Sequence, residues 1–129
     1  MSRIDPAKII DRAAIMIRDG YPQGEVEPGV WLCWSQRYGA EKIYTVTAYD
    51  CSCWMGENKR SIVCKHRFAC HAPLIVDFIQ NMRDSNGLDE LRSLGEAYAE
   101  EMKRVPECFV DYARKEYEMK RDELKEQAA

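Results

Sequence analysis

The sequence has no run of about 18 apolar residues, which is the length that a membrane-spanning helix needs. Its first residues, MSRIDP, also lack the apolar stretch behind a basic start that marks a secretory leader. A formal net charge of −3 over 129 residues excludes the strongly basic character that attracts nucleic acid to a whole domain. We therefore expect a cytoplasmic, non-secreted protein that has no membrane partner.

Histidine is scarce in this chain, and the histidines that it has are clustered with cysteine. The chain contains 2 histidines and 6 cysteines, and the stretch from Tyr49 to His71 holds both histidines and most of the cysteines. In a reducing compartment, clustered cysteines more often bind metal than form disulfides. The even number of cysteines leaves a disulfide framework as the alternative, and we expect metal.

The residues of this stretch form two closely spaced pairs. Cys51 and Cys53 make a Cys-x-Cys pair, and Cys64 and His66 make a Cys-x-His pair. Three thiolates and one imidazole are a full tetrahedral set for Zn²⁺. Residues two apart share a face of a strand, but on a helix they lie about 200° apart around the axis. The first pair can therefore converge where a strand ends, and the second pair can converge if Cys64 precedes a helix and His66 lies in its first turn.

Two further residues leave the ligand set open. Cys70 lies one helical turn after His66, and His71 follows it, so that either is near enough in sequence to contribute. We expect Cys70 to be a small buried apolar residue and His71 to lie on the helix surface or in the core. Cys33 and Cys108 are distant in sequence and are expected to be packing residues. Because two pairs already supply four ligands, a closed structural site is favoured over a catalytic one, which keeps a position open to water.

The residues before the cluster predict a helix and a hairpin, as part of an α+β fold. Asp5-Pro6 is a typical helix start, with apolar residues at helical spacing behind it and Gly20 at its end. Segments 30–34 and 43–49 are aromatic and β-branched and predict two strands, the second running directly into Cys51. Between the helix and the strands, Tyr21 to Gly24 is predicted to be a turn-rich connector.

The residues after the cluster predict helices throughout. A helix is predicted from about Lys65, with an interruption at Pro73 and an end near Gly87. Two charged helices follow, separated by Pro106, with apolar stripes at Leu88, Leu91, Leu94, Tyr98 and Met102 and at Phe109 or Val110, Ala113, Tyr117 and Leu124. We divide the chain into a zinc-binding domain with a leading helix, residues 1–85, and a charged helical extension, residues 86–129.

The residues around the two pairs resemble the SWIM zinc finger, in which a β-hairpin feeds a Cys-x-Cys and a Cys-x-His opens a helix. The match covers roughly Asp5 to Ile79 and includes the leading helix found in small prokaryotic and phage members. The chain departs from the family after each pair, because many members have Pro-Asp-Phe after the first pair and an apolar run after the second. The matching segments are Trp31 with Ser35-Gln36, Tyr44-Thr45-Val46, Cys51-Ser52-Cys53 and Cys64-Lys65-His66.

The resemblance implies a structural Zn²⁺ and a DNA-binding or protein-interaction role, without catalysis by the finger. We hypothesise a non-enzymatic module that binds DNA or a DNA-processing protein, because basic side chains bind phosphates and an exposed aromatic ring can stack on a base. The predicted nucleic-acid contacts are Trp54, Lys59, Arg60, Lys65 and Arg67. The alternative is an assembly subunit that forms protein contacts or oligomers through the C-terminal helices, with the basic residues an ordinary solvated surface.

Overall fold

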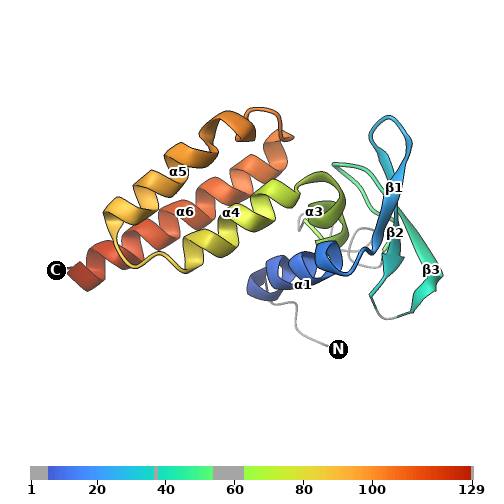
Figure 1. Ribbon diagram of the computed structural model, residues 1–129, viewed down its shortest axis with the longest axis horizontal. Helices are drawn as coiled ribbons and strands as arrows, with labels where there is room; N and C mark the ends of the chain where they lie inside the picture. The colour runs from blue at the N-terminus through green and yellow to red at the C-terminus, as the bar shows by residue number, and fades with distance from the viewer. Residues whose placement is uncertain (1–5, 37, 54–62, 129) are drawn as a thin grey trace. The chain divides into compact units, whose positions relative to one another are not determined.

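The computed structural model describes residues 6–36, 38–53 and 63–128. Its fold is α+β, as predicted: a leading helix, a three-stranded antiparallel sheet, and then a run of helices to the C-terminal end (Figure 1). The elements are α1 (Pro6–Arg18), β1 (Pro22–Glu27), β2 (Val30–Ser35), β3 (Gly39–Val46), α3 (Lys65–His71), α4 (Pro73–Arg83), α5 (Leu88–Met102) and α6 (Glu107–Ala128).

The contacts within the chain divide it into two compact units, Met1–Pro73 and Leu74–Ala129. The sheet, α1 and α3 belong to the first unit, whereas α5, α6 and all of α4 except Pro73 belong to the second. This division lies earlier in the chain than the boundary predicted after Ser85. The predicted boundary marks the end of a zinc-binding domain, whereas the two units are defined by contacts alone. The boundary after Ser85 therefore stays a prediction.

Helix α3 is central to the first unit, because it packs against α1 and also contacts all three strands. The face that α1 buries carries Ile9, Ile10, Ala13 and Met16, each at most 4% exposed and spaced as the periodicity predicts. Gly20, which has a φ of 76°, follows the end of α1 and allows the left-handed turn that leads to the sheet. Helix α3 thus packs against both α1 and the sheet.

Strand β1 corrects the prediction of a connector at Tyr21 to Gly24. It pairs antiparallel with β2, with irregular register at two points, and its residues are mostly exposed. Its sequence, PQGEVE, is poor in β-branched and aromatic residues, so that propensity does not reveal it. The strand forms because the chain turns at Gly29, where φ is 79°, and returns as β2. The residues of β2 have strong β propensity, so β2 provides a hydrogen-bonding partner for β1.

Strand β3 also ends earlier than predicted, at Val46 rather than Tyr49. Thr47 and Asp50 close a turn instead: the Thr47 amide donates to the Asp50 carbonyl at 2.8 Å, and the Asp50 amide donates to Thr47 Oγ1 at 2.9 Å. The side chain of a β-branched residue is thus used to satisfy a turn. Strand β3 therefore does not run directly into Cys51, as predicted for this strand, because a reversal of the chain separates the two.

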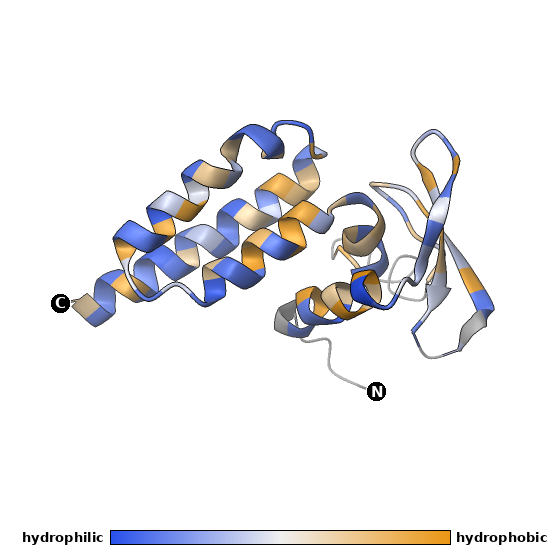
Figure 2. Cartoon of the chain, viewed as in Figure 1, coloured by the Kyte–Doolittle hydropathy of each residue, from blue (hydrophilic) through white to orange (hydrophobic). Residues whose placement is uncertain are grey.

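The second unit contains three helices that are joined by side chains. Tyr98 of α5 donates its hydroxyl proton to Asp77 of α4 and accepts a hydrogen bond from Asn81 at 3.0 Å. Lys120 of α6 donates to the carbonyl of Arg83 at 3.0 Å. Hydrophobic and hydrophilic residues alternate along these helices (Figure 2). The buried apolar residues of the three helices are Ile75, Val76, Phe78, Ile79, Met82, Leu91, Phe109, Ala113 and Leu124.

The predicted interruptions are confirmed in this part of the chain. Pro73 begins α4 directly after Ala72, the residue that caps the C-terminal end of α3, and Pro106 separates α5 from α6. Proline lacks an amide hydrogen and clashes with the preceding turn, which explains why both helices stop before it.

Candidate metal centre

The four predicted ligands lie together in the first unit. The ligand atoms of Cys51, Cys53, Cys64 and His66 are all within 4.8 Å of one another. All four side chains are buried, with 1–5% of their surface exposed. They are therefore close enough to hold a single metal ion, out of contact with bulk solvent.

The first pair is positioned by the turn that follows β3. Cys51 forms an isolated antiparallel bridge with Val46, so that the returning chain lies beside the end of the strand. Ser52 then makes two hydrogen bonds with Thr45: its amide donates to the Thr45 carbonyl at 3.1 Å, and its Oγ accepts from the Thr45 amide at 2.9 Å. Ser52 is exposed, whereas the cysteines on either side of it are buried. The small hydroxyl residue in Cys-Ser-Cys thus anchors the pair to the sheet.

The second pair has the geometry that its spacing predicts. Cys64 is the N-cap of α3, with extended backbone angles of φ −77° and ψ 163°, and His66 lies in the first turn. The Cys64 carbonyl accepts the first hydrogen bond of the helix, from the Phe68 amide at 3.3 Å. The change from extended to helical backbone at Cys64 brings its sulfur to the same point as the imidazole of His66.

The imidazole of His66 shows that a metal ion fits this cluster. Both of its ring nitrogens are buried and have no hydrogen-bond partner among the residues that the structure describes. Leaving a buried polar atom without a partner is costly, and such atoms usually mark an ion, a water or a function. The ring itself packs against Tyr44, with 4.6 Å between the ring centroids, which sets its orientation. An ion bound to the three sulfurs would supply a partner for one of the His66 nitrogens.

The close grouping of the thiols raises the pKa of both Cys51 and Cys64. The hydrogen bond with Cys53, a second one with Cys64 and burial all raise the pKa of Cys51. The hydrogen bond from Cys51 lowers the pKa of Cys64, but Cys53 and burial outweigh it and raise that pKa to about 11. A cation among the sulfurs reverses this balance, because a coordinating thiol is deprotonated by the metal.

Cys70 and His71 are not members of this cluster of metal-ligand atoms. His71 Nε2 lies 3.0 Å from the Val46 carbonyl oxygen, and its ring meets that of Trp31 edge-on at 6.4 Å. Cys70 is buried, as predicted. Cys33 of β2 is buried as well, and its thiol donates a hydrogen bond to the Trp34 carbonyl at 3.6 Å. Cys108 lies in α6 and is half-buried.

The structure describes two of the five predicted nucleic-acid contacts, since Trp54, Lys59 and Arg60 lie outside the described residues. Arg67 is only 6% exposed, and its Nε donates to the Ala48 carbonyl at 2.9 Å. It holds the turn before Cys51, so its position does not support the predicted contact. Lys65 is half-buried and donates from Nζ to Gln36 Oε1 at 2.8 Å.

Comparisons with protein-family models, with curated proteins and with solved structures find no match for this chain. The resemblance to the SWIM finger therefore remains a prediction from the residues. Within the described ranges, no helix is both long enough and apolar enough to cross a membrane.

Proposed function

We propose that this chain is a SWIM-type zinc-binding protein in which the ion has a structural role. The observation that carries the proposal is the buried group of three thiols and one imidazole within 4.8 Å, in which neither His66 nitrogen has a hydrogen-bond partner in the described part of the chain. Sulfur with imidazole nitrogen in a tetrahedral set suits Zn²⁺, whereas hard cations prefer oxygen ligands. Zinc is therefore the ion that these donors favour.

The proposed role is structural because the protein fills all four positions around the ion. A catalytic zinc keeps one position for water or substrate. Here one ligand pair follows β3 and the other begins α3, so that the ion joins the sheet to the helix. We accordingly propose a non-enzymatic module.

Metal analysis tests this proposal directly. The chain purified without added metal is expected to contain about one zinc ion, by the four-ligand rule. Cys51→Ser and His66→Ala should each lose it, whereas Cys108→Ser, a matched cysteine change outside the cluster, should retain it. Full retention of zinc by both ligand variants refutes the ligand set, and an equivalent of iron in place of zinc refutes the choice of ion.

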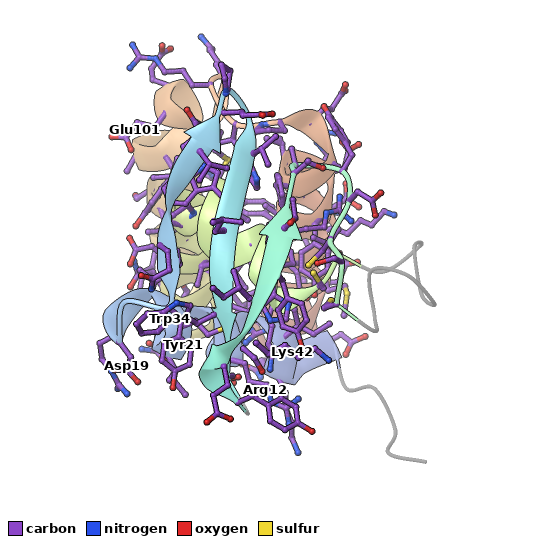
Figure 3. All side chains as sticks on the ribbon, turned by 90° about the vertical axis from the view of Figure 1, so that its right-hand side faces the viewer. Arg12, Asp19, Tyr21, Trp34, Lys42 and Glu101 are labelled. Atoms are coloured by element: carbon purple, nitrogen blue, oxygen red, sulfur yellow. The ribbon has the colours of Figure 1, made fainter. Side chains whose placement is uncertain are left out.

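We extend the proposal to DNA binding on the side of the metal centre where β3 exposes Lys42 (Figure 3). The Lys42 ammonium lies 5.8 Å from the ring centroid of Tyr38 and 5.7 Å from that of Tyr44. Tyr38 is 48% exposed, and Tyr44 packs on the ligand His66. A cation beside an exposed aromatic ring suits a phosphate backbone with unstacked bases. The segment between the ligand pairs would contribute the predicted contacts Trp54, Lys59 and Arg60.

Fluorescence anisotropy with labelled single- and double-stranded DNA over a salt series tests this extension. Lys42→Ala is expected to weaken binding and to reduce the salt slope by about one. Lys125→Ala, an exposed lysine at the end of α6, serves as the matched control and should leave affinity unchanged. The absence of binding at about 50 mM salt rejects a DNA partner, because phosphate contacts are strongest at low salt.

The alternative is an assembly role for the second unit. It is favoured by an apolar pocket of about 360 Å³ whose lining includes Phe78, Gly95, Met102 and Tyr117. If the chain does not bind DNA and light scattering shows a stable dimer, the assembly role is favoured over DNA binding.

A further inference from the structure

Helices α5 and α6 of the second unit run side by side (Figure 1), and a pocket of about 360 Å³ opens where they meet. Pockets of this size commonly hold small molecules. The lining residues of each helix are three or four positions apart, so they share one face of that helix. The apolar and aromatic ones are Gly95, Ala99 and Met102 of α5 and Val110, Ala113 and Tyr117 of α6.

Gly95 and two aromatic rings set the shape of this pocket. A glycine inside a helix is destabilising relative to alanine, so its presence in α5 needs a reason. A β-carbon at position 95 would lie 3.2 Å from Cε2 of Tyr117, which is closer than ordinary van der Waals contact. Gly95 therefore lets the Tyr117 ring lie directly on α5. Phe78 of α4 also lines the pocket, and its ring packs on that of Tyr98 with 5.1 Å between the centroids. The walls of the pocket are thus held by packing.

The charged residues that line the pocket are both basic, as far as the described residues go. They are Lys103, which directly follows α5, and Arg114 of α6. Each forms an ion pair with an acid three residues before it: Lys103 with Glu100 at 2.8 Å, and Arg114 with Asp111 at 2.9 Å. Neither acid is among the lining residues. Exposed pairs of this kind contribute little to stability, so an anion in the pocket can draw both cations toward it.

We propose that this pocket binds a medium-chain fatty acid, with its carboxylate at Lys103 and Arg114 and its hydrocarbon chain along the apolar lining. A carboxylate has two oxygens that match the planar fork of a guanidinium group. The apolar lining removes the hydrocarbon from water, and the unbranched Met102 side chain adapts to a flexible chain. All of these residues lie in the second unit, so the inference does not depend on the proposed zinc.

Isothermal titration calorimetry of the full chain with decanoate tests the proposal. We expect saturable binding of about one decanoate per chain. Decanol has the same hydrocarbon chain without the charge, and it should bind about ten-fold more weakly because it loses the charge-assisted hydrogen bonds. Decyltrimethylammonium, which carries the opposite charge, should bind more weakly still. Equal affinity for the three compounds, or no binding heat at about 1 mM decanoate, would overturn the proposal.

A variant at Ala99 tests where the ligand binds. Ala99 lines the pocket and is exposed, so Ala99→Leu fills space in the pocket without removing a buried side chain. This variant should lose decanoate binding. Ala97→Leu is the matched control, because Ala97 is an exposed alanine of the same helix outside the lining, and it should bind decanoate as the wild type does. Circular dichroism checks that both variants keep their helices. Wild-type affinity in a folded Ala99→Leu variant would refute this location.

Variants of the two cations separate the effect of charge from that of shape. Lys103→Gln and Arg114→Gln should each weaken decanoate binding about ten-fold and leave decanol binding unchanged. A purely structural effect would weaken both ligands equally and so contradict the proposed carboxylate contact. Lys115→Gln, a change of an exposed neighbour outside the lining, should alter neither affinity.

Light scattering tests whether a second copy of the chain occupies the pocket instead. We expect the same mass for the wild type and for Ala99→Leu without decanoate. A stable wild-type dimer that Ala99→Leu dissociates would show that the pocket is an interface and would overturn the fatty-acid proposal. The comparison of decanoate with decanol on the wild type decides the matter even if a variant fails to fold.

Discussion

Removal of the metal is expected to unfold the first unit while α5 and α6 keep their helical signal. Binding of a structural zinc is worth on the order of 10–16 kcal/mol in zinc-finger peptides, and this free energy is folding free energy. That is as large as the whole stability of a typical domain, which is about 5–15 kcal/mol. Without the ion, the buried His66 nitrogens have no partner within residues 6–36, 38–53 and 63–128, and the two proposed ligand pairs are no longer tied to each other. The sheet and α3 then have little to hold them together.

The tryptophans make this prediction easy to measure. All 3 tryptophans, at positions 31, 34 and 54, lie within the first unit. A chelator titration should therefore shift the tryptophan emission to the red as zinc leaves, while far-UV circular dichroism keeps the contribution of α5 and α6. Cys51→Ser should show the shifted emission without chelator, and Cys108→Ser should resemble the wild type. Unchanged tryptophan emission after complete removal of zinc would contradict a structural role for the ion.

Replacement of Phe109 is expected to destabilise the second unit and to leave the first unit folded. Phe109 lies near the start of α6 in the second unit and is 0% exposed. Phe109→Ala should lower the free energy of unfolding by about 3–5 kcal/mol, because it removes a buried ring and leaves a cavity. All four proposed metal ligands lie in the first unit. The variant should therefore still bind one zinc ion and keep the wild-type tryptophan emission.

Val110→Ala is the matched control, because Val110 is the next residue and is only half-buried. It should cost clearly less than the Phe109 change, since fewer buried contacts are lost. Urea denaturation followed by circular dichroism measures both variants. A cost below about 1 kcal/mol for Phe109→Ala would show that this ring does not hold the second unit together. Loss of zinc from the same variant would show that the two units do not fold independently.

The cluster of candidate metal ligands is the part of the protein that is most readily predicted from the residues. Its members come in two pairs with short spacings, so that the local backbone at each pair decides whether the side chains converge. The prediction that Cys64 precedes a helix and His66 begins it needs only the angle between helical residues, and the structure confirms it. The helices themselves follow from apolar periodicity and from proline, which are also local signals.

Other features depend on residues that are far apart in the sequence. Strand β1 exists because β2 offers it a hydrogen-bonding edge, although its own residues do not favour a strand. The turn at Thr47 replaces a strand end because the Thr47 side chain and the Asp50 backbone close hydrogen bonds within it. In both cases the decisive partner is a backbone group or side chain whose position the local pattern does not reveal.

The same distinction separates the candidate metal ligands from the basic residue Arg67. Cys51, Cys53, Cys64 and His66 are recognisable before folding is considered, because their spacing limits the geometries available to them. Arg67 is drawn inward only because α3 packs against the sheet and Ala48 presents a carbonyl to it. Short-range spacing thus specifies the candidate ligand set, and long-range packing specifies where the charged side chain of Arg67 is held, because that contact depends on how the helix is placed on the sheet.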